Sequence, residues 1–391
     1  YIIYNNTIRV LMNLKLTSIN GGLKIEVHEN SSQKSGITTG SVATAASVAA
    51  LLKLVDKAPD IVKITAPTTT LTVEIEDTSF IDNNTARAIV KKPNYNDPDV
   101  TRGMEIISEV TLTNNSGVIE ITGGDGVGRV TKPGLQIPVG EYAINPVPRK
   151  MIKENIMKYL PEDNGAIIKI IIPEGKKIAP KTMNSRLGII DGISILGTTG
   201  IARPMSSKAY TDSLRVQIDV ALANGYKDLL FVPGNIGTRI AKEKLVLDED
   251  EIIEMSNFVG YMLEEAHKTG KIRSITLFGH AGKLIKIAAG IFNTKQSVAD
   301  ARREIMTAYA GLVGANKKTL HDIYNCITTE DVIKILDENN ITTEVFELIA
   351  NKIVELCSLK YEGIKFHAVI VKMNGEILTP SHIQNIPFNK K

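Results

Sequence analysis

The sequence contains no tryptophan, and aromatic residues make up only 5% of its 391 residues. Proteins that bind single-stranded nucleic acid stack the bases on aromatic side chains, and proteins that bind duplexes neutralise phosphates with many cationic side chains. The formal net charge of this chain is only +3. The scarcity of aromatic side chains and the small charge both argue against a nucleic acid partner.

Cysteine is almost absent as well. The two cysteines, Cys326 and Cys357, have no CxxC spacing, so we expect two buried free thiols in a reducing cytoplasm. The histidines other than His280 lack the paired spacing of a zinc site. The sequence therefore predicts neither a disulfide framework nor a metal held by the protein itself.

Long hydrophobic runs are also missing. No segment approaches the roughly 18 apolar residues of a membrane-spanning helix, and residues 1–12 lack the apolar core of a secretory signal. We expect a cytoplasmic protein with no membrane partner. Because the chain opens at Tyr1 and Met12 is a candidate start, we interpret residues 1–12 as a non-native or disordered extension.

The length favours two domains, because 391 residues exceed one ordinary hydrophobic core. Residues 13–180 read as a mixed α+β domain with an alanine-rich helix at about 41–55, a proline-punctuated loop at 133–148 and a short helix near 155–159. The strand-like runs of this domain occupy residues 61–65, 71–76, 105–112, 118–122 and 166–172.

Residues 181–391 show a different pattern, in which a predicted strand, a glycine loop and a helix repeat. The three glycine loops occupy residues 197–200, 234–237 and 279–283, and each follows a strand-like run, at 193–196, 228–232 and 274–278. This pattern is typical of a Rossmann-like parallel sheet, whose loops at the carboxyl ends of the strands share one rim. Helices are expected over about 297–357, and residues 366–372 predict a last strand at the edge of the sheet.

Glycine loops at the carboxyl ends of parallel strands favour a nucleotide-like ligand, although tight strand-to-helix turns would look the same. None of the loops is a complete dinucleotide fingerprint, because no acidic residue is expected at the end of the second strand, and Asn235 takes that place. Leu284 replaces the Ser or Thr of a Walker A loop, which argues against phosphoryl transfer. The candidate cofactor-binding residues are Gly197, Thr198, Thr199, Gly200, Gly234, Asn235, Gly237, Gly279 and Gly282.

Two further motifs lie in the first half. Residues 123–129 are dense in glycine and form either a hairpin or flexible loop, or a substrate flap in which Asp125 acts as acid or base and Arg129 and Lys132 pair with ligand carboxylates. Residues 36–41 lead into the alanine-rich helix, where their hydroxyls and amides either bind an anion or only cap the helix. His280, in a rim loop, is the second candidate acid or base.

Four segments of the chain closely resemble the CbiD family. They are GITTGS at 36–41, GGDGVGRVTKPG at 123–134, DGISILGTTGI at 191–201 and GHAGKLIKIAAGIFNT at 279–294, and the resemblance extends over roughly residues 13–375. Val42 stands where members of the family often have Cys. Ala281 and the pair Lys295 and Gln296 also depart from the common family pattern.

The resemblance implies a cobalt-precorrin-5B C-1-methyltransferase, which transfers a methyl group from S-adenosylmethionine to a cobalt-containing tetrapyrrole and gives cobalt-precorrin-6A. It implies a two-part fold, with a tetrapyrrole-facing domain at 13–180 and a Rossmann-like, cofactor-binding domain at 181–391. Cobalt then arrives inside the substrate. The residues expected to bind the substrate are Thr38, Thr39, Gly40, Ser41, Arg129, Lys132, Arg203 and Lys283, with Lys208 and Arg302 adding positive charge.

Two other functions stay open at this point. An NAD(P)-dependent oxidoreductase would also use glycine loops at the rim of a parallel sheet. A non-catalytic tetrapyrrole carrier would bind the macrocycle but would have no use for three such loops. Association into a homo-oligomer is compatible with either function and with the methyltransferase.

Overall fold

The computed structural model describes residues 14–19, 22–27, 36–55, 57–95, 99–202 and 207–391. The chain divides into two compact units: unit 1 consists of Tyr1–Thr131 and Gln136–Ser206, and unit 2 of Lys132–Leu135 and Ser207–Lys391. The expected extension at 1–12 lies outside the described residues. The division falls after residue 206 rather than after 180, because strands within residues 189–202 pair with strands of unit 1.

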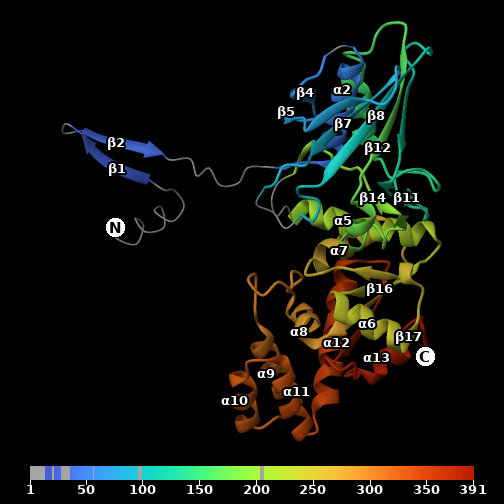
Figure 1. Cartoon of the computed structure of the whole chain (residues 1–391). Coiled ribbons are helices and arrows are strands. Elements are labelled where there is room, and N and C mark those ends of the chain that lie inside the picture. The colour runs from blue at the N-terminus through green and yellow to red at the C-terminus, as the bar shows by residue number, and fades with distance from the viewer. Residues whose placement is uncertain (1–13, 20–21, 28–35, 56, 96–98, 203–206) are drawn as a thin grey trace. The chain divides into compact units, whose positions relative to one another are not determined.

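Unit 1 is a mixed α+β structure (Figure 1). Its strands are β1 (Leu14–Ile19), β2 (Gly22–Val27), β3 (Gly36–Ile37), β4 (Ile61–Thr65), β5 (Thr70–Glu74), β6 (Asp77–Phe80), β7 (Thr85–Lys91), β8 (Glu105–Thr113), β9 (Ile119–Gly123), β10 (Gly126–Val127), β11 (Arg129–Val130), β12 (Gly165–Ile171), β13 (Ile189–Ile190), β14 (Gly192–Ile193) and β15 (Ile201–Ala202). Its helices are α2 (Thr39–Leu54), α3 (Pro146–Ile156), α4 (Gly175–Ile178) and the 3₁₀ turn η1 (Ala179–Lys181).

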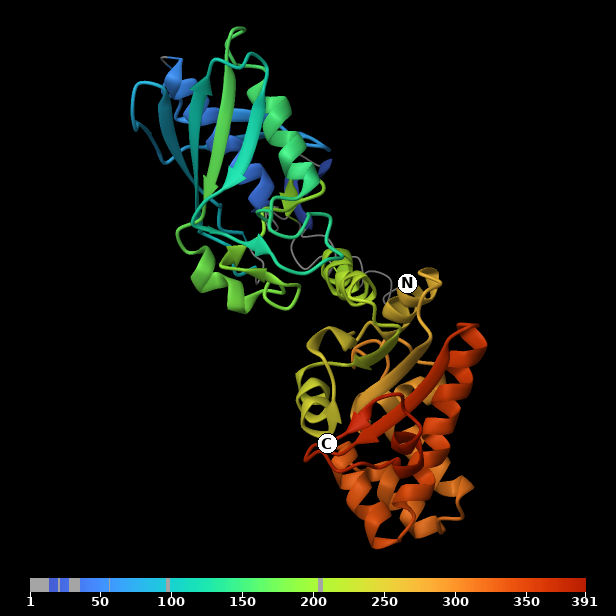
Figure 2. The same cartoon turned by 90° about the vertical axis from the view of Figure 1, so that its right-hand side faces the viewer.

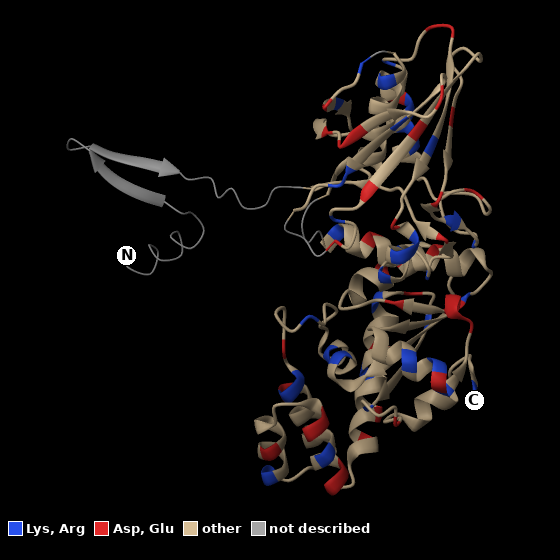
Figure 3. Ribbon diagram, in the orientation of Figure 1, with Lys and Arg blue, Asp and Glu red and all other residues tan. Residues whose placement is uncertain are grey.

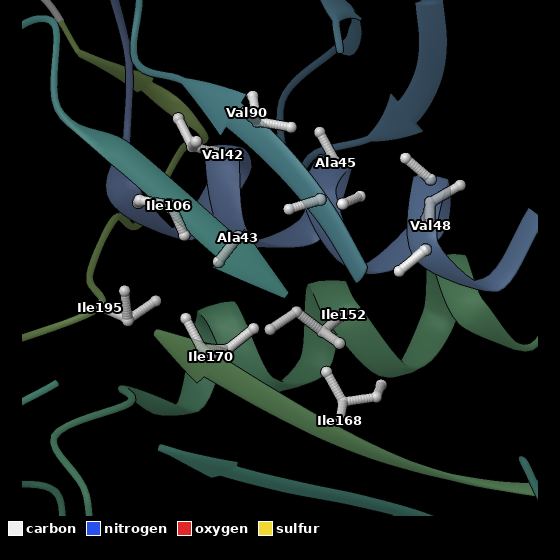
Figure 4. Close-up of a cluster of buried hydrophobic side chains, with 14 of the residues drawn as sticks. Val42, Ala43, Ala45, Val48, Val90, Ile106, Ile152, Ile168, Ile170 and Ile195 are labelled. Atoms are coloured by element: carbon white, nitrogen blue, oxygen red, sulfur yellow. The ribbon is translucent and has the colours of Figure 1, made fainter. Parts of the chain in front are cut away.

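The main sheet of unit 1 has the order β6-β7-β8-β12-β9 and is antiparallel except between β12 and β9. Helix α2 packs on it through small side chains such as Ala43 and Ala45, which let the helix backbone approach the strands (Figure 4). Val42 is fully buried in the same core beside Val90 and Ile106, so its side chain serves packing here.

Charged residues lie along several strands of this sheet, coloured blue and red in Figure 3, and three of them, Arg87, Glu109 and Lys169, pair across β7, β8 and β12. Glu109 in β8 accepts hydrogen bonds from Arg87 in β7 and Lys169 in β12, and these cations hold the pKa of its carboxyl below the ordinary value, against the opposing effect of partial burial. Because side chains alternate along a strand, the residues of β7 and β8 that do not face α2 necessarily face outward. One face of the sheet is therefore core and the other is a charged surface.

The segment of unit 1 that is rich in proline contains a helix that the sequence analysis placed too late. Helix α3 begins at Pro146 and ends at Ile156, whereas a loop was expected up to 148 and a helix near 155–159. Proline is tolerated in the first turn of a helix because the amide that it lacks has no partner there. Pro146 and Pro148 therefore start this helix instead of preventing it.

The glycine-rich segment at 123–129 is neither a hairpin nor a flexible loop. β10 pairs in parallel with β14, and β11 pairs antiparallel with β13, so the segment crosses a second stretch of chain in close contact. Gly126 has a φ of 73°, and a Cβ built on it would lie 1.8 Å from the carbonyl oxygen of Ile172. The glycines here allow backbones to touch, and this packing removes the basis for a substrate flap.

Unit 2 combines a parallel sheet with helices. Its strands are β16 (Asp228–Val232), β17 (Leu245–Val246), β18 (Ile252–Glu254), β19 (Ser274–His280), β20 (Lys365–Val371) and β21 (Asn389–Lys390). Its helices are α5 (Ser207–Ala223), α6 (Asn235–Lys244), η2 (Glu249–Glu251), α7 (Val259–Lys268), α8 (Ala281–Leu284), η3 (Ile285–Ala289), α9 (Arg302–Leu312), α10 (Lys317–Asn325), α11 (Thr329–Glu338), α12 (Thr342–Lys360) and α13 (Pro380–Gln384).

The main sheet of unit 2 has the order β18-β16-β19-β20, and all of its neighbouring strands are parallel. The predicted edge strand at 366–372 is confirmed as β20, and α12 packs beside it, both in red tones in Figure 2. From β16 the chain runs first to β18 on one side and then to β19 on the other. The direction of winding therefore reverses between β16 and β19, where α/β sheets usually bind ligands.

None of the helices in the described part of the chain combines the length and apolar composition that crossing a membrane requires.

We expect the buried His367 of unit 2 to make the free energy of unfolding depend on pH. Burial lowers the pKa of His367 below its ordinary value of 6.5; nearby Lys365 and His382 act in the same direction, and Asp228 opposes them. Between the folded-state pKa and the ordinary value of 6.5, the unfolded chain binds more protons at His367 than the folded chain does. The stability that neutral His367 contributes is therefore complete above pH 6.5 and is lost as the pH falls through the folded-state pKa.

The variant His367→Leu tests this contribution, because it removes the titrating group from β20. Urea unfolding at about pH 7.5 and about pH 5.5 should show that the wild type loses more stability than the variant on acidification. The carboxylates titrate in both proteins and cancel in the comparison. Equal losses in the two proteins would contradict the role of His367.

Candidate functional site

The carboxyl edge of the parallel sheet in unit 2 brings two of the predicted glycine loops together. The first loop joins β16 to α6, and Gly234 is the N-cap of this helix with a φ of 143°. A Cβ built on Gly234 meets only the Oε1 atom of Glu254, at 3.9 Å. No side chain caps the first turn of α6. Among the described residues, the amides of this first turn therefore have no side-chain partner, an arrangement that suits an anionic or hydroxyl-bearing ligand.

The second loop follows β19 and contacts the first. A Cβ on Gly279 would lie 2.6 Å from the Cδ atom of Pro233, and the Lys283 ammonium donates a hydrogen bond of 2.8 Å to the Pro233 carbonyl oxygen. Burial lowers the pKa of Lys283, with Lys286 acting in the same direction, while Glu254 opposes the shift. Lys283 was expected to bind substrate, but in the structure it ties the two loops to each other.

Glu254 is a candidate site residue that the sequence analysis missed. It ends β18, a short strand beyond α6 that the sequence did not predict; the strand expected to lack a terminal acid was the one at 228–232, and no acid ends it. Gln217 fixes the strand end by accepting from the Glu254 amide at 3.0 Å and donating to its carbonyl at 3.1 Å. An acid about 20 residues beyond the first glycine loop is the usual partner of ribose hydroxyls, and this spacing was the available signal.

His280 lies in the second loop with both ring nitrogens bonded inside the protein. Its Nδ1 atom accepts from the Gly282 amide at 3.2 Å, so Nε2 carries the proton and donates to Glu330 at 2.9 Å. The same carboxylate oxygen accepts from the Met373 amide. This arrangement connects α11 and the end of β20 to the loop, and it favours a positioning role for His280 over the acid or base expected from the sequence.

The variant His280→Asn separates these two roles, because Asn can cap the Gly282 amide but cannot carry protons near neutral pH. For the methyl transfer that the family resemblance implies, we expect the single-turnover rate constant to fall by less than about threefold, since loss of a general base typically costs about a hundredfold or more. The measurement is single-turnover methyl transfer with saturating cofactor. A hundredfold loss with unchanged cofactor affinity would assign proton transfer to His280.

The third glycine loop, residues 197–200, belongs to unit 1 and follows no strand of the parallel sheet. The strand before it, β14, pairs only with β10 among the described strands, so local pattern misplaced Gly197, Thr198, Thr199 and Gly200. A Cβ on Gly197 would lie 2.4 Å from the Oγ1 atom of Thr38. This loop packs against the start of α2, and the strand that precedes it lies outside the parallel sheet of unit 2.

The hydroxyls expected to bind an anion at the start of α2 are used inside unit 1. Thr38 caps the helix by accepting from the Ser41 amide, and Ser41 donates to the Gly200 carbonyl at 2.7 Å. Thr39 exchanges hydrogen bonds with the backbone of Leu196. The Gly40 amide is engaged as well, because it donates to the Leu196 carbonyl at 3.0 Å. Of the two alternatives, capping is the one that these contacts support.

The remaining predicted residues are divided between the two units. Asp125 is exposed and pairs with Lys176 at 2.6 Å in unit 1. Arg129, also exposed, lies over the Tyr142 ring at 4.1 Å and donates to the Gly140 carbonyl. Lys132 belongs to unit 2, where it pairs with Asp250 at 2.6 Å. Arg203 lies outside the described residues, and Lys208 is exposed beside Asp212.

Two family models match this chain. The CbiD family model matches residues 26–204, and the model for the CbiD C-terminal domain matches residues 293–382. The loops at 234–237 and 279–283 lie between the two matched ranges. A crystal structure of the cobalamin biosynthesis protein cbiD from Archaeoglobus fulgidus aligns at 28% identity over 71% of this chain and 87% of that chain, with a TM-score of 0.38.

Curated relatives match most of the chain. A protein of Methanobrevibacter smithii named cobalt-precorrin-5B C(1)-methyltransferase is 52% identical over 88% of this chain and 96% of its own length. Proteins of the same name from Methanococcus aeolicus and Methanocaldococcus jannaschii are 54% and 50% identical, over 79% and 88% of this chain and 82% and 95% of their own lengths. The chain belongs to the CbiD family.

Proposed function

We propose that the protein transfers a methyl group from S-adenosylmethionine to C-1 of cobalt-precorrin-5B and thereby gives cobalt-precorrin-6A. The strongest support is the identity of about half of all aligned residues, over nearly the whole length, with relatives named cobalt-precorrin-5B C(1)-methyltransferase. Such identity along both units favours a shared reaction and not only a shared domain. Cobalt in this proposal is part of the substrate.

The carboxyl edge of unit 2 fits the methyl donor. A Rossmann-like use of this edge places the ribose hydroxyls at Glu254 and the polar groups of the cofactor at the amides of Asn235 and Gly237. A Cβ on Gly234 would meet only Glu254 within 4 Å, and the contact of Gly279 with Pro233 sets the spacing of the two loops. Lys283 and His280 hold the second loop in place. These residues form a preorganised cradle.

When bound, S-adenosylmethionine supplies an activated methyl group, whose bond to sulfur breaks, leaving the electron pair on sulfur, as the bond to the ring carbon forms. The residues of this chain therefore need to align the reactants and exclude water, and they need no covalent nucleophile. In unit 1 we propose Arg129 as a contact for a substrate carboxylate. Its stacking on Tyr142 and its bond to Gly140 fix the guanidinium plane while leaving further N–H donors.

Isothermal titration of the full chain with S-adenosylhomocysteine, NAD and NADP tests the cofactor. We expect saturable binding of S-adenosylhomocysteine and its loss in Gly279→Val, whose side chain would displace Pro233. The control Gly270→Ala meets no atom within 4 Å in the same unit and should bind normally. Binding of NAD or NADP alone would favour an oxidoreductase, and binding of none of the three would favour a tetrapyrrole carrier.

A further inference from the structure

Unit 2 contains a pocket of about 250 Å³ that lies outside the glycine loops. It is formed by the segment before α9, the first turns of α9 and the connection from α10 to α11. The residues that line it are Gln296, Asp300, Arg302, Arg303, Met306, Cys326, Ile327, Thr328, Thr329 and Val332. All of them fall within the range matched by the C-terminal family model.

Two arginines line this pocket, and one carboxylate is already engaged there. Arg302 donates from Nε and Nη2 to the two oxygens of Asp300, at 2.6 and 2.7 Å, and Gln296 donates to the same carboxylate at 3.1 Å. These donors lower the pKa of Asp300 to about 2, so the group is ionised at neutral pH. Both oxygens of Asp300 therefore have partners before any ligand binds.

Arg303 leaves the pocket with excess positive charge. Its guanidinium lies 5.7 Å from the centre of the Tyr324 ring, and among the residues that the structure describes no carboxylate pairs with it. The pocket also has an apolar part, because the side chains of Met306 and Val332 are buried beneath it. The pocket therefore combines Arg303, which has no carboxylate partner within the described part of the chain, with the apolar side chains of Met306 and Val332. This combination suits a short aliphatic chain that ends in an anion.

The pocket borders a hydrogen-bonded segment on one side and the loop of His280 on the other. The buried ammonium of Lys286 donates to the carbonyls of Thr294 and Ala299, which fixes the segment before α9. On the other side, the Oγ1 atom of Thr329 lies 3.3 Å from the position of a Cβ on Gly282, and Glu330 accepts from His280. The first turn of α11 therefore separates the pocket from the second glycine loop by a single layer of side chains.

We propose that this pocket binds one carboxylate-bearing side chain of the tetrapyrrole substrate, an inference that rests on the proposed methyltransferase function. An amino-acid head group would need a carboxylate for its ammonium, but Asp300 is already engaged by Arg302 and Gln296. An uncharged alkyl group would leave Arg303 without a partner. A carboxylate on a short methylene arm satisfies both the cation and the apolar floor, and it anchors the substrate beside the cofactor loop.

Cys326 supplies a readout that does not depend on activity, because it lines the pocket and is partly exposed. Cys357, the other cysteine of the chain, is fully buried, and burial raises the pKa of its thiol to about 12. Alkylation of the folded protein by the neutral reagent iodoacetamide should therefore report on Cys326. Peptide mass spectrometry distinguishes the two thiols.

The probe is a metal-free porphyrin with eight carboxylate side chains, and the control ligand is a tetracationic porphyrin of similar ring size. We expect the carboxylated porphyrin at saturation to slow alkylation of Cys326 about tenfold, and the cationic porphyrin to leave the rate unchanged. Arg303→Gln should weaken binding of the carboxylated porphyrin about tenfold, because it removes a charge-assisted hydrogen bond. Lys318→Gln makes the same change of charge on exposed α10, outside the pocket, and should bind like the wild type.

Equal protection by the two porphyrins, no protection at saturation, or equal affinities of the Arg303 and Lys318 variants would each overturn the pocket assignment. Titration of the same samples with S-adenosylhomocysteine separates this failure from failure of the proposed function. If the cofactor product binds the wild type while the thiol experiment fails, the methyltransferase proposal stands and the pocket assignment falls. If the cofactor product does not bind, the methyltransferase proposal falls, and the pocket assignment, which rests on it, falls with it.

Discussion

Replacing Gly126 with alanine should destabilise unit 1 by about 4 kcal/mol or more, which combines the strain of a positive φ with severe overpacking. The added Cβ would lie 1.8 Å from the carbonyl oxygen of Ile172, and that residue cannot move freely. The Ile172 amide donates to the backbone carbonyl of Asp125 at 2.9 Å, and the Ile172 carbonyl accepts from the Gly175 amide at 2.8 Å. Relief of the clash therefore breaks these hydrogen bonds or shifts Gly126, which pairs with Gly192 where β10 meets β14.

Hydrogen exchange measured by mass spectrometry tests this expectation and shows which unit responds. Amides of α2 and β12 in unit 1 should lose protection in Gly126→Ala. The matched control is Gly117→Ala, because Gly117 has a φ of 71° but a Cβ there meets no atom within 4 Å. This control should cost only about 1 kcal/mol of strain. Similar losses in the two variants would show that φ strain, and not the crossing, accounts for the effect.

Replacing Glu254 with alanine should raise the Kd for S-adenosylhomocysteine about a hundredfold, because hydrogen bonds from ribose hydroxyls to a carboxylate contribute about 1.5–3 kcal/mol. The two hydrogen bonds of Gln217 hold the backbone of Glu254, so the substitution leaves the end of β18 in place. The loops at 233–237 and 279–283 keep their contact through Lys283 and Pro233.

The control for this prediction is Glu243→Ala on α6. Glu243 is exposed and pairs with Arg239, so its removal makes the same change of charge in the same unit but away from the edge of the sheet. Isothermal titration should give this variant a Kd within about twofold of the wild type, as expected for an exposed ion pair. If Glu254→Ala binds as tightly as the control, the acid does not contact the cofactor.

The elements that sequence patterns predicted well are those whose patterns are local. The alanine-rich helix, the strands at 61–65 and 228–232, and the last strand of the parallel sheet all follow from periodicity and composition within one segment. Where the prediction failed, the deciding contact was distant. The loop at 197–200 has the local form of a strand-to-helix turn, but pairing of β14 with β10 places it in unit 1.

Glu254 shows the same division for the candidate site. Its strand has only three residues and follows an acidic turn at Glu249–Glu251, so its own sequence gives little sign of a strand. Pairing with β16 makes it a strand and places the carboxylate at the carboxyl edge. The glycines at 234 and 279 were visible as candidates, but only the contacts of Lys283 and Pro233 show that the two loops meet.

By itself, the sequence determined the membership of a family, the presence of a parallel sheet in the second half and the two glycine loops at its edge. Tertiary structure alone decided that the third loop lies elsewhere, that Gly126 serves a backbone crossing, and that Glu254 and the Arg303 pocket exist. The physical reason is that periodicity and turn chemistry act between residues close in the chain. Strand pairing, close backbone contact and the convergence of charges depend on residues far apart in the chain, which only the folded structure brings together.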